Sequence, residues 1–115
     1  MSKTRKDGDF IGDILEAMER ISLYIKDLTC QKFLEDRKTQ DAVVRNFEII
    51  GEAAKNLSSD FKAQNASVPW KKISGLRDKL IHFYFGVDNK IVWSIAKKEL
   101  PHLYKTIRSL LTEEV

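Results

Sequence analysis

The chain has 115 residues, of which 43% are hydrophobic and 32% charged, a balance typical of one soluble helical domain covering residues 1–115. Its single cysteine excludes an internal disulfide framework, and five glycines and two prolines are too few for the many turns of a β-sandwich. The formal net charge of +3 permits an acidic partner such as RNA, but an ordinary solvated surface gives the same value.

No stretch of the sequence resembles a targeting or membrane-spanning segment. The residues after Met1 lead into no apolar signal region, and no apolar run approaches the roughly 20 residues of a membrane span. His82 and His102 are twenty positions apart, which is not a zinc-ligand spacing. We therefore expect a cytoplasmic protein with no membrane contact, no metal site and no cofactor, in which His102 is structural or solvated.

The first half of the sequence predicts two long helices. The first runs from about Gly8 to Leu28 and carries one apolar stripe, a short helical turn is expected near Gln31–Glu35, and the second long helix covers about Arg37 to Leu57. The second helix has a coiled-coil-like apolar seam, which consists of Val43, Phe47, Ile50, Ala54 and Leu57.

Arg45, Glu48 and Glu52 lie on a different face of the second helix from this seam. They are interpreted as a solvated stripe of salt-bridging side chains.

The second half predicts shorter helices. Residues 58–68 are polar and weakly patterned, and they are expected to form the longest connection in the chain. Pro69 suits the first position of a helix, Asp88 is a predicted N-cap, and Pro101 is expected to start or kink the last helix. Gly86 is expected to cap the helix that precedes Asp88. The predicted fold class is all-α, a compact up-and-down bundle of four to five helices.

One stretch, residues 76–86, combines a permanent cation, a carboxylate, an imidazole and a phenol. Arg77 offers a planar fork that fits phosphate oxygens. Histidine has an ordinary pKa close to neutrality, so His82 is suited to give and take protons at cellular pH. Arginine and histidine without a metal set are what cleavage of a phosphodiester by a neighbouring hydroxyl requires.

The spacing within this stretch bears on how the groups can meet. Asp78 and His82 are four apart and share a helix face, so the carboxylate can orient the imidazole or stabilise its cation. Arg77 and His82 are five apart and do not project together. Either Arg77 reaches across with its long side chain, or a second copy of the helix supplies the missing group, which predicts a site shared by a homodimer.

These residues also have simpler interpretations. An Arg–Asp pair on a helix is usually a surface feature, and a histidine between apolar residues is often a core residue. Lys71, Lys72 and Lys79 could bind the phosphate backbone of a nucleic acid, although a few surface lysines are common in any protein.

The arrangement of four segments resembles a known family. The run Arg77–Tyr84 has the Arg-x4-His-x-Tyr pattern of the HepT-like branch of HEPN-domain toxins, and residues 45–54 resemble the second-helix signature of that family. The flanking segments 69–73 and 85–88, followed by Trp93, also fit. The agreement extends from about Phe10 to Leu111.

The resemblance implies a metal-independent endoribonuclease, the toxin of a prokaryotic toxin–antitoxin pair. Its implied partners are an RNA substrate such as tRNA or mRNA and an MntA-type nucleotidyltransferase antitoxin, which attaches AMP to the motif tyrosine. Carried onto this sequence, Arg77 and His82 are catalytic, Asp78 supports the site, and Tyr84 positions RNA and accepts AMP.

In the expected mechanism the 2′-OH of RNA attacks the adjacent phosphate, with His82 as general base or acid and Arg77 stabilising the developing charge. The alternative is a non-catalytic helical module that binds nucleotide or docks a nucleotidyltransferase. The same side chains could then hold a phosphate without cleaving it.

Overall fold

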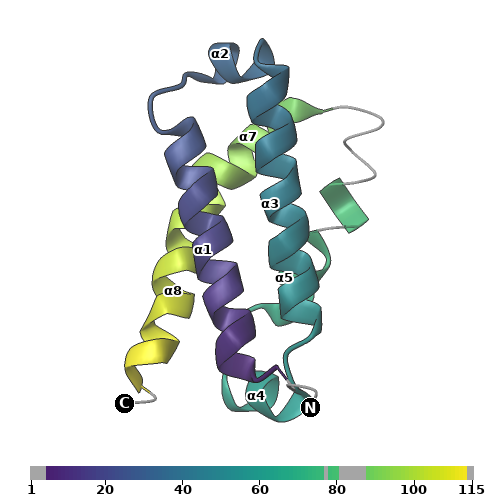
Figure 1. Cartoon of the computed structure of the whole chain (residues 1–115), viewed down its shortest axis with the longest axis vertical. Helices are drawn as coiled ribbons and strands as arrows, with labels where there is room; N and C mark the ends of the chain where they lie inside the picture. Colours follow the sequence, from purple (N-terminus) through teal and green to yellow (C-terminus); the bar gives the residue numbers. More distant parts are fainter. Residues whose placement is uncertain (1–4, 77, 81–87, 114–115) are drawn as a thin grey trace.

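The computed structural model describes residues 5–76, 78–80 and 88–113, and every regular element within these ranges is helical. The predicted all-α class is therefore confirmed. In chain order the elements are α1 (Asp7–Ile25), α2 (Cys30–Leu34), α3 (Arg37–Lys55), α4 (Ser59–Gln64), α5 (Trp70–Ser74), α7 (Asn89–Ser94), the π-helix η1 (Ile95–Glu99) and α8 (Leu100–Glu113) (Figure 1).

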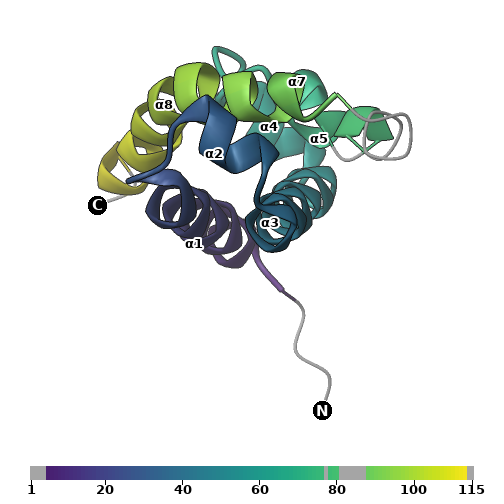
Figure 2. The same cartoon turned by 90° about the horizontal axis from the view of Figure 1, so that it is seen from above.

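The helices form two layers. The long helices α1 and α3 lie side by side and run in opposite directions, with the short helix α2 between their ends (Figure 1). Seen from above, α5, α7 and α8 cover one side of this pair (Figure 2). A hydrogen bond from Tyr104 Oη on α8 to Glu19 Oε2 on α1 (2.7 Å) also joins the layers. This bond and partial burial raise the pKa of Tyr104 above its ordinary value.

The core between the layers is continuous and apolar. The predicted apolar seam is confirmed, because its four residues on α3 are buried and so is Leu57, which lies just beyond the end of that helix. The fully buried side chains of α1, the seam and α8 include Ile14, Met18, Phe47, Ile50 and Ile107. Since burying each large apolar side chain contributes about 1.5–3 kcal/mol, the packing of α1 against α3 and α8 is the main support of the fold.

The side chain of the N-cap residue fixes where four of these helices begin, namely α2, α3, α4 and α7. The predicted cap at Asp88 is confirmed, since its Oδ1 accepts a hydrogen bond from the Lys90 N–H (3.1 Å). Asp36 accepts bonds from both the N–H and the hydroxyl of Thr39 (3.0 and 2.6 Å) at the start of α3. The hydroxyl bond is the larger cause of the lowered pKa of Asp36.

The ends of the two long helices differ from the predictions by a few residues. The first helix stops at Ile25 rather than Leu28, because the chain turns there, with the Leu28 N–H donating to the Ile25 carbonyl (3.1 Å). The apolar stripe continues past this turn, so periodicity alone extends the helix too far. The second long helix ends at Lys55, two residues before the predicted Leu57.

Residues 58–68 were predicted only as a long connection, and the structure shows a helix within them. Helix α4 occupies much of this connection, capped by Ser58, whose hydroxyl accepts a bond from the Phe61 N–H (3.1 Å). Phe61 is buried against Trp70, with ring centroids 6.0 Å apart. Phe61 is the only large apolar residue of α4, so the helix shows no periodicity that would predict it.

Two predictions for prolines need adjustment. Pro69 is the N-cap of α5 rather than its first residue. Pro101 lies in the first turn of α8, which continues from α7 through η1 without a break. Within η1 the Leu100 N–H donates to the Ile95 carbonyl, five residues back. This wider turn relieves the clash that a proline ring makes with the carbonyl four residues earlier.

Candidate functional site

A short helical turn, residues 76 and 78–80, carries the described part of the motif. The turn follows directly from α5, because the Gly75 N–H donates to the Lys71 carbonyl and the Lys79 N–H to the Gly75 carbonyl (both 3.0 Å). A side chain at position 75 would bring its Cβ to 3.2 Å from the Lys71 carbonyl oxygen, so the junction favours glycine. Leu76 and Leu80, four residues apart, are buried and fix this turn to the core.

The chain is fixed again where it enters α7. Gln40, on α3, is buried and uses both ends of its amide. Its Nε2 donates to the Phe33 carbonyl (2.8 Å), and its Oε1 accepts a bond from Asn89 Nδ2 (3.1 Å). The start of α7 is therefore attached to α3 by Gln40, whose other hydrogen bond reaches α2, and the sequence pattern did not indicate this connection.

The predicted site residues divide between described and undescribed positions. Asp78 and Lys79 are exposed on the turn after α5, and Lys71 and Lys72 are exposed on α5 itself. This places them where a ligand can reach them. The turn at 78–80 lies beside α3, on the side away from α1 (Figures 1 and 2).

The predictions for Arg77, His82, Tyr84 and Gly86 lie outside the described residues.

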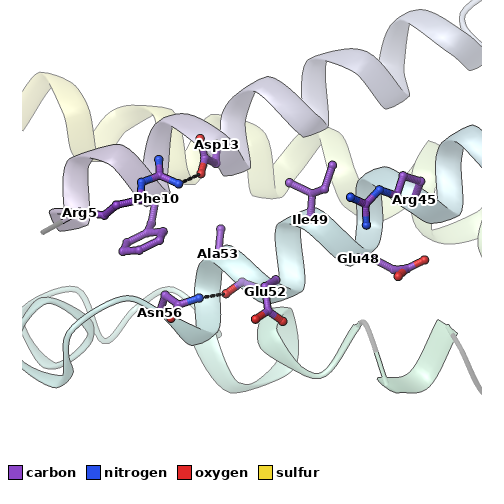
Figure 3. Close-up of a pocket in the computed structure, with 9 residues that line it drawn as sticks. All are labelled: Arg5, Phe10, Asp13, Arg45, Glu48, Ile49, Glu52, Ala53 and Asn56. Atoms are coloured by element: carbon purple, nitrogen blue, oxygen red, sulfur yellow. Dashed lines mark hydrogen bonds and ion pairs between the residues drawn. The ribbon is translucent and has the colours of Figure 1, made fainter. Parts of the chain in front are cut away.

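A first groove, the α1–α3 groove, lies between the two long helices and has a volume of about 300 Å³ (Figure 3). At one end, Arg5 Nη1 pairs with Asp13 Oδ2 at 2.8 Å, and the Arg5 guanidinium lies 4.8 Å from the centre of the Phe10 ring. The bond to Asp13 raises the pKa of Arg5. The charge of Arg5 is thus already satisfied within the chain.

The other wall of the α1–α3 groove comes from α3. Arg45 and Glu52 are exposed and Glu48 is partly exposed, while Ile49 and Ala53 point towards α1 (Figure 3). The prediction that Arg45, Glu48 and Glu52 lie apart from the buried seam is confirmed. The groove holds two arginines and three carboxylates, so its charges nearly balance.

A second groove, the α5–α8 groove, lies between the segment leading into α5 and the η1–α8 helix, and it has a volume of about 380 Å³. Lys72 Nζ and Glu99 Oε1 join its walls at 2.9 Å, and both side chains keep substantial exposure, 63% and 42%. Lys98 and His102 line the same groove and are exposed. With its one carboxylate already paired to Lys72, the groove has an excess of positive charge.

Of the described residues that line the α5–α8 groove, Lys72 alone was a predicted site residue. The sequence pattern does not indicate Lys98 as a site residue, and it predicts that His102 is structural or solvated. The signal that could have indicated them is the distribution of charge. Lysine and arginine outnumber aspartate and glutamate by ten to six after Leu57, whereas the numbers up to Leu57 are ten and eleven.

Two further properties bear on the type of protein. Among the described residues, no group of three or more His, Cys, Asp or Glu side chains is placed to hold a metal ion. None of the helices in the described part of the chain has both the length and the apolar character needed to cross a membrane.

Comparisons with family models and with curated proteins both indicate the same family. Residues 14–110 match the family model described as "Ribonuclease HepT-like". The chain is 46% identical over 99 residues to "Probable ribonuclease HepT" of Thermococcus cleftensis, covering 86% of this chain and 90% of the relative. No solved structure matches the chain significantly.

Two further relatives carry related names. "Putative RNase MJ0127" of Methanocaldococcus jannaschii is 46% identical over 104 residues, which are 90% of this chain and 86% of the relative. "Putative RNase TTE0752" of Caldanaerobacter subterraneus subsp. tengcongensis is 42% identical over 105 residues, 91% and 94% of the two chains. The similarity therefore extends over nearly the whole length of each protein.

Proposed function

Because this chain belongs to the HepT-like ribonuclease family, we propose that it is an endoribonuclease that acts in the cytoplasm. The observation that carries the proposal is the family match over residues 14–110, which includes the whole Arg-x4-His-x-Tyr motif. Asp78 and Lys79 support it, because their exposure leaves this part of the motif accessible to a large substrate.

The reaction uses the 2′-OH of the substrate as its nucleophile. His82 takes the proton from the 2′-OH as the oxygen attacks the adjacent phosphorus, or delivers a proton to the leaving 5′ oxygen. Arg77 stabilises the negative charge that develops on the non-bridging oxygens. The P–O5′ bond breaks, which leaves a 2′,3′-cyclic phosphate and a 5′-OH. DNA has no 2′-OH and is not cut.

The proposed reaction does not need a metal ion, since the arginine supplies the positive charge and the histidine moves the proton. Cleavage should therefore persist in EDTA. Loss of activity on chelation, restored by magnesium, would contradict this mechanism.

The site is completed by a homodimer. Arg77 and His82 are five apart in sequence and diverge on a straight helix, so two copies of the motif facing across a cleft supply both groups to one phosphate. Sedimentation at micromolar concentration should give a dimer. A fully active monomer would rule out the shared site.

The protein is the toxin of a toxin–antitoxin pair, and Tyr84 is the point of control. An MntA-type nucleotidyltransferase transfers AMP from ATP to the phenol of Tyr84 and releases pyrophosphate. Arg77 and Tyr84 are seven apart, two helical turns, so the added phosphate comes close to the arginine. That phosphate pairs with Arg77 and repels incoming RNA.

Intact mass after coexpression with such a nucleotidyltransferase tests this control. Wild type should gain one or more AMP units and lose activity, whereas Tyr84→Phe should gain none and stay active. A modified and silenced Tyr84→Phe protein would place the acceptor elsewhere.

The catalytic proposal itself is tested by end-mapping cellular RNA after expression of wild type and His82→Ala. Wild type should produce fragments with cyclic-phosphate and 5′-OH ends, and His82→Ala and Arg77→Ala should produce none while keeping wild-type helicity by circular dichroism. If wild type binds RNA but never cuts it, the chain is instead a non-catalytic nucleotide-binding or docking module.

A further inference from the structure

The α5–α8 groove is a separate feature from the motif but is connected to it. Lys72 lies on α5, and α5 leads through Gly75 into the turn that carries Asp78 and Lys79 by the two backbone hydrogen bonds described above. An RNA strand that extends from this turn along α5 would pass Lys72, which lines the groove.

The charges of the groove suit a polyanion. Lys98 and His102 are both exposed and lie on the wall formed by η1 and the start of α8. On the opposite wall the Lys72 ammonium is held by Glu99 at 2.9 Å, in a pair exposed enough for a ligand to compete with it. An exposed ion pair of this kind contributes little stability, so opening it costs little.

We propose that the α5–α8 groove binds backbone phosphates of the RNA strand whose cleavage is assigned to the motif. Lys98 and His102 donate to phosphate oxygens, and an incoming phosphate replaces Glu99 as the partner of Lys72. The groove thus carries affinity without reading sequence, because phosphate contacts are the same for every base. This inference rests on the proposed function for its substrate, but binding can be measured without cleavage.

The proposal predicts changes of opposite sign in RNA affinity for two kinds of substitution in the groove. Removing Lys98 or His102 takes away a phosphate contact and should weaken RNA binding. Removing the charge of Glu99 frees Lys72 and should strengthen it. A purely structural role for the Lys72–Glu99 pair does not predict tighter binding when the pair is broken.

The experiment measures fluorescence anisotropy of a short fluorescein-labelled single-stranded RNA with the full chain carrying His82→Ala, so that the RNA stays intact. In this background Lys98→Gln and His102→Ala should each raise Kd roughly threefold or more, and Lys98→Gln should also lower the slope of log Kd against log salt concentration by about one. Glu99→Gln should lower Kd roughly twofold or more.

Matched control variants distinguish an effect of the groove on Kd from an effect of the net charge of the protein. Lys26→Gln, just after α1, and Glu35→Gln, just after α2, make the same charge changes elsewhere in the molecule, and they should change Kd by much less than Lys98→Gln and Glu99→Gln. Lys98→Arg keeps the charge and should restore binding, which excludes loss of folding as the cause.

The outcomes distinguish the two proposals. Equal effects of Lys98→Gln and Lys26→Gln, or no effect of either, would overturn the groove as an RNA site. Weakened binding in Lys98→Gln alongside a wild type that never cuts RNA would support the groove and reject the proposed catalysis.

Discussion

The α1–α3 groove and the α5–α8 groove contain similar kinds of side chain and differ in their balance of charge. The α1–α3 groove has two arginines and three carboxylates, and Arg5 is engaged by Asp13 and by the Phe10 ring. The α5–α8 groove has two lysines, an exposed histidine and a single carboxylate that is already paired.

This difference shows why a net charge of +3 says little by itself. A groove whose positive and negative side chains are nearly equal in number offers little net attraction to a charged ligand. A local excess of one sign on an accessible wall does offer a contact, whatever the total charge of the protein.

The largest expected effect is on the free energy of unfolding, and it concerns the apolar core that supports the helices of both grooves. Phe47 is fully buried on α3, so Phe47→Ala should lower the free energy of unfolding by about 3–5 kcal/mol, measured by urea denaturation. Leu23→Ala is the control, since Leu23 is 68% exposed and its truncation should cost less than about 0.5 kcal/mol. Equal effects of the two variants would mean that α3 does not pack as described.

A smaller effect concerns the connection between α3, which lines the α1–α3 groove, and α7, which continues into η1 at the α5–α8 groove. Gln40→Leu removes the partners of the Phe33 carbonyl and of Asn89 Nδ2, and it should cost about 1–3 kcal/mol because buried polar groups lose their hydrogen bonds. Amide hydrogen exchange in α7 should also become faster. Gln31→Leu, on the exposed surface of α2, should change neither measurement. Unchanged exchange in Gln40→Leu would show that α7 is held by other contacts.

The smallest effect is expected in the α1–α3 groove. Asp13→Asn breaks the exposed pair with Arg5, and the stability change should fall within the error of denaturation because such pairs contribute little. RNA affinity should also stay that of the parent chain, in contrast to Lys98→Gln. A large loss of RNA binding in Asp13→Asn would reverse the comparison, since the α1–α3 groove would then be the one that contacts the substrate.

The sequence predicted those parts of the fold that depend on strong periodicity. The seam of α3 repeats every three or four residues over several turns, and the predicted burial is correct at each position. Helix α4 was missed because one phenylalanine in six residues makes no pattern, and its position depends on contact with Trp70. Whether so short a helix forms depends on its contacts with distant segments, which the local sequence does not show.

In the candidate site, features set by neighbouring residues were predictable from the sequence, and contacts between distant residues were not. The motif was identified from residues adjacent in sequence, and Asp88 was recognised as a cap because capping is a local rule. The pairing of Lys72 with Glu99 joins positions twenty-seven apart, and no local pattern indicates it. Lys98 and His102 join the groove only because the packing of α8 brings them opposite α5.

The π-helix η1 has a consequence for how this chain tolerates changes in length. A hydrogen bond from Leu100 back to Ile95 spans five residues where an α-helix spans four, so η1 holds one residue more than the same turn of α-helix. Deleting Lys97 would leave Leu100 and Ile107 facing the core, because the lost residue is the surplus one. Deleting a residue inside α8 would instead rotate everything beyond it by ~100° and expose the apolar face. The surplus residue of η1 can therefore be lost without changing which face of α8 meets the core, although an ordinary α-helical turn there returns the clash between the Pro101 ring and the carbonyl four residues earlier.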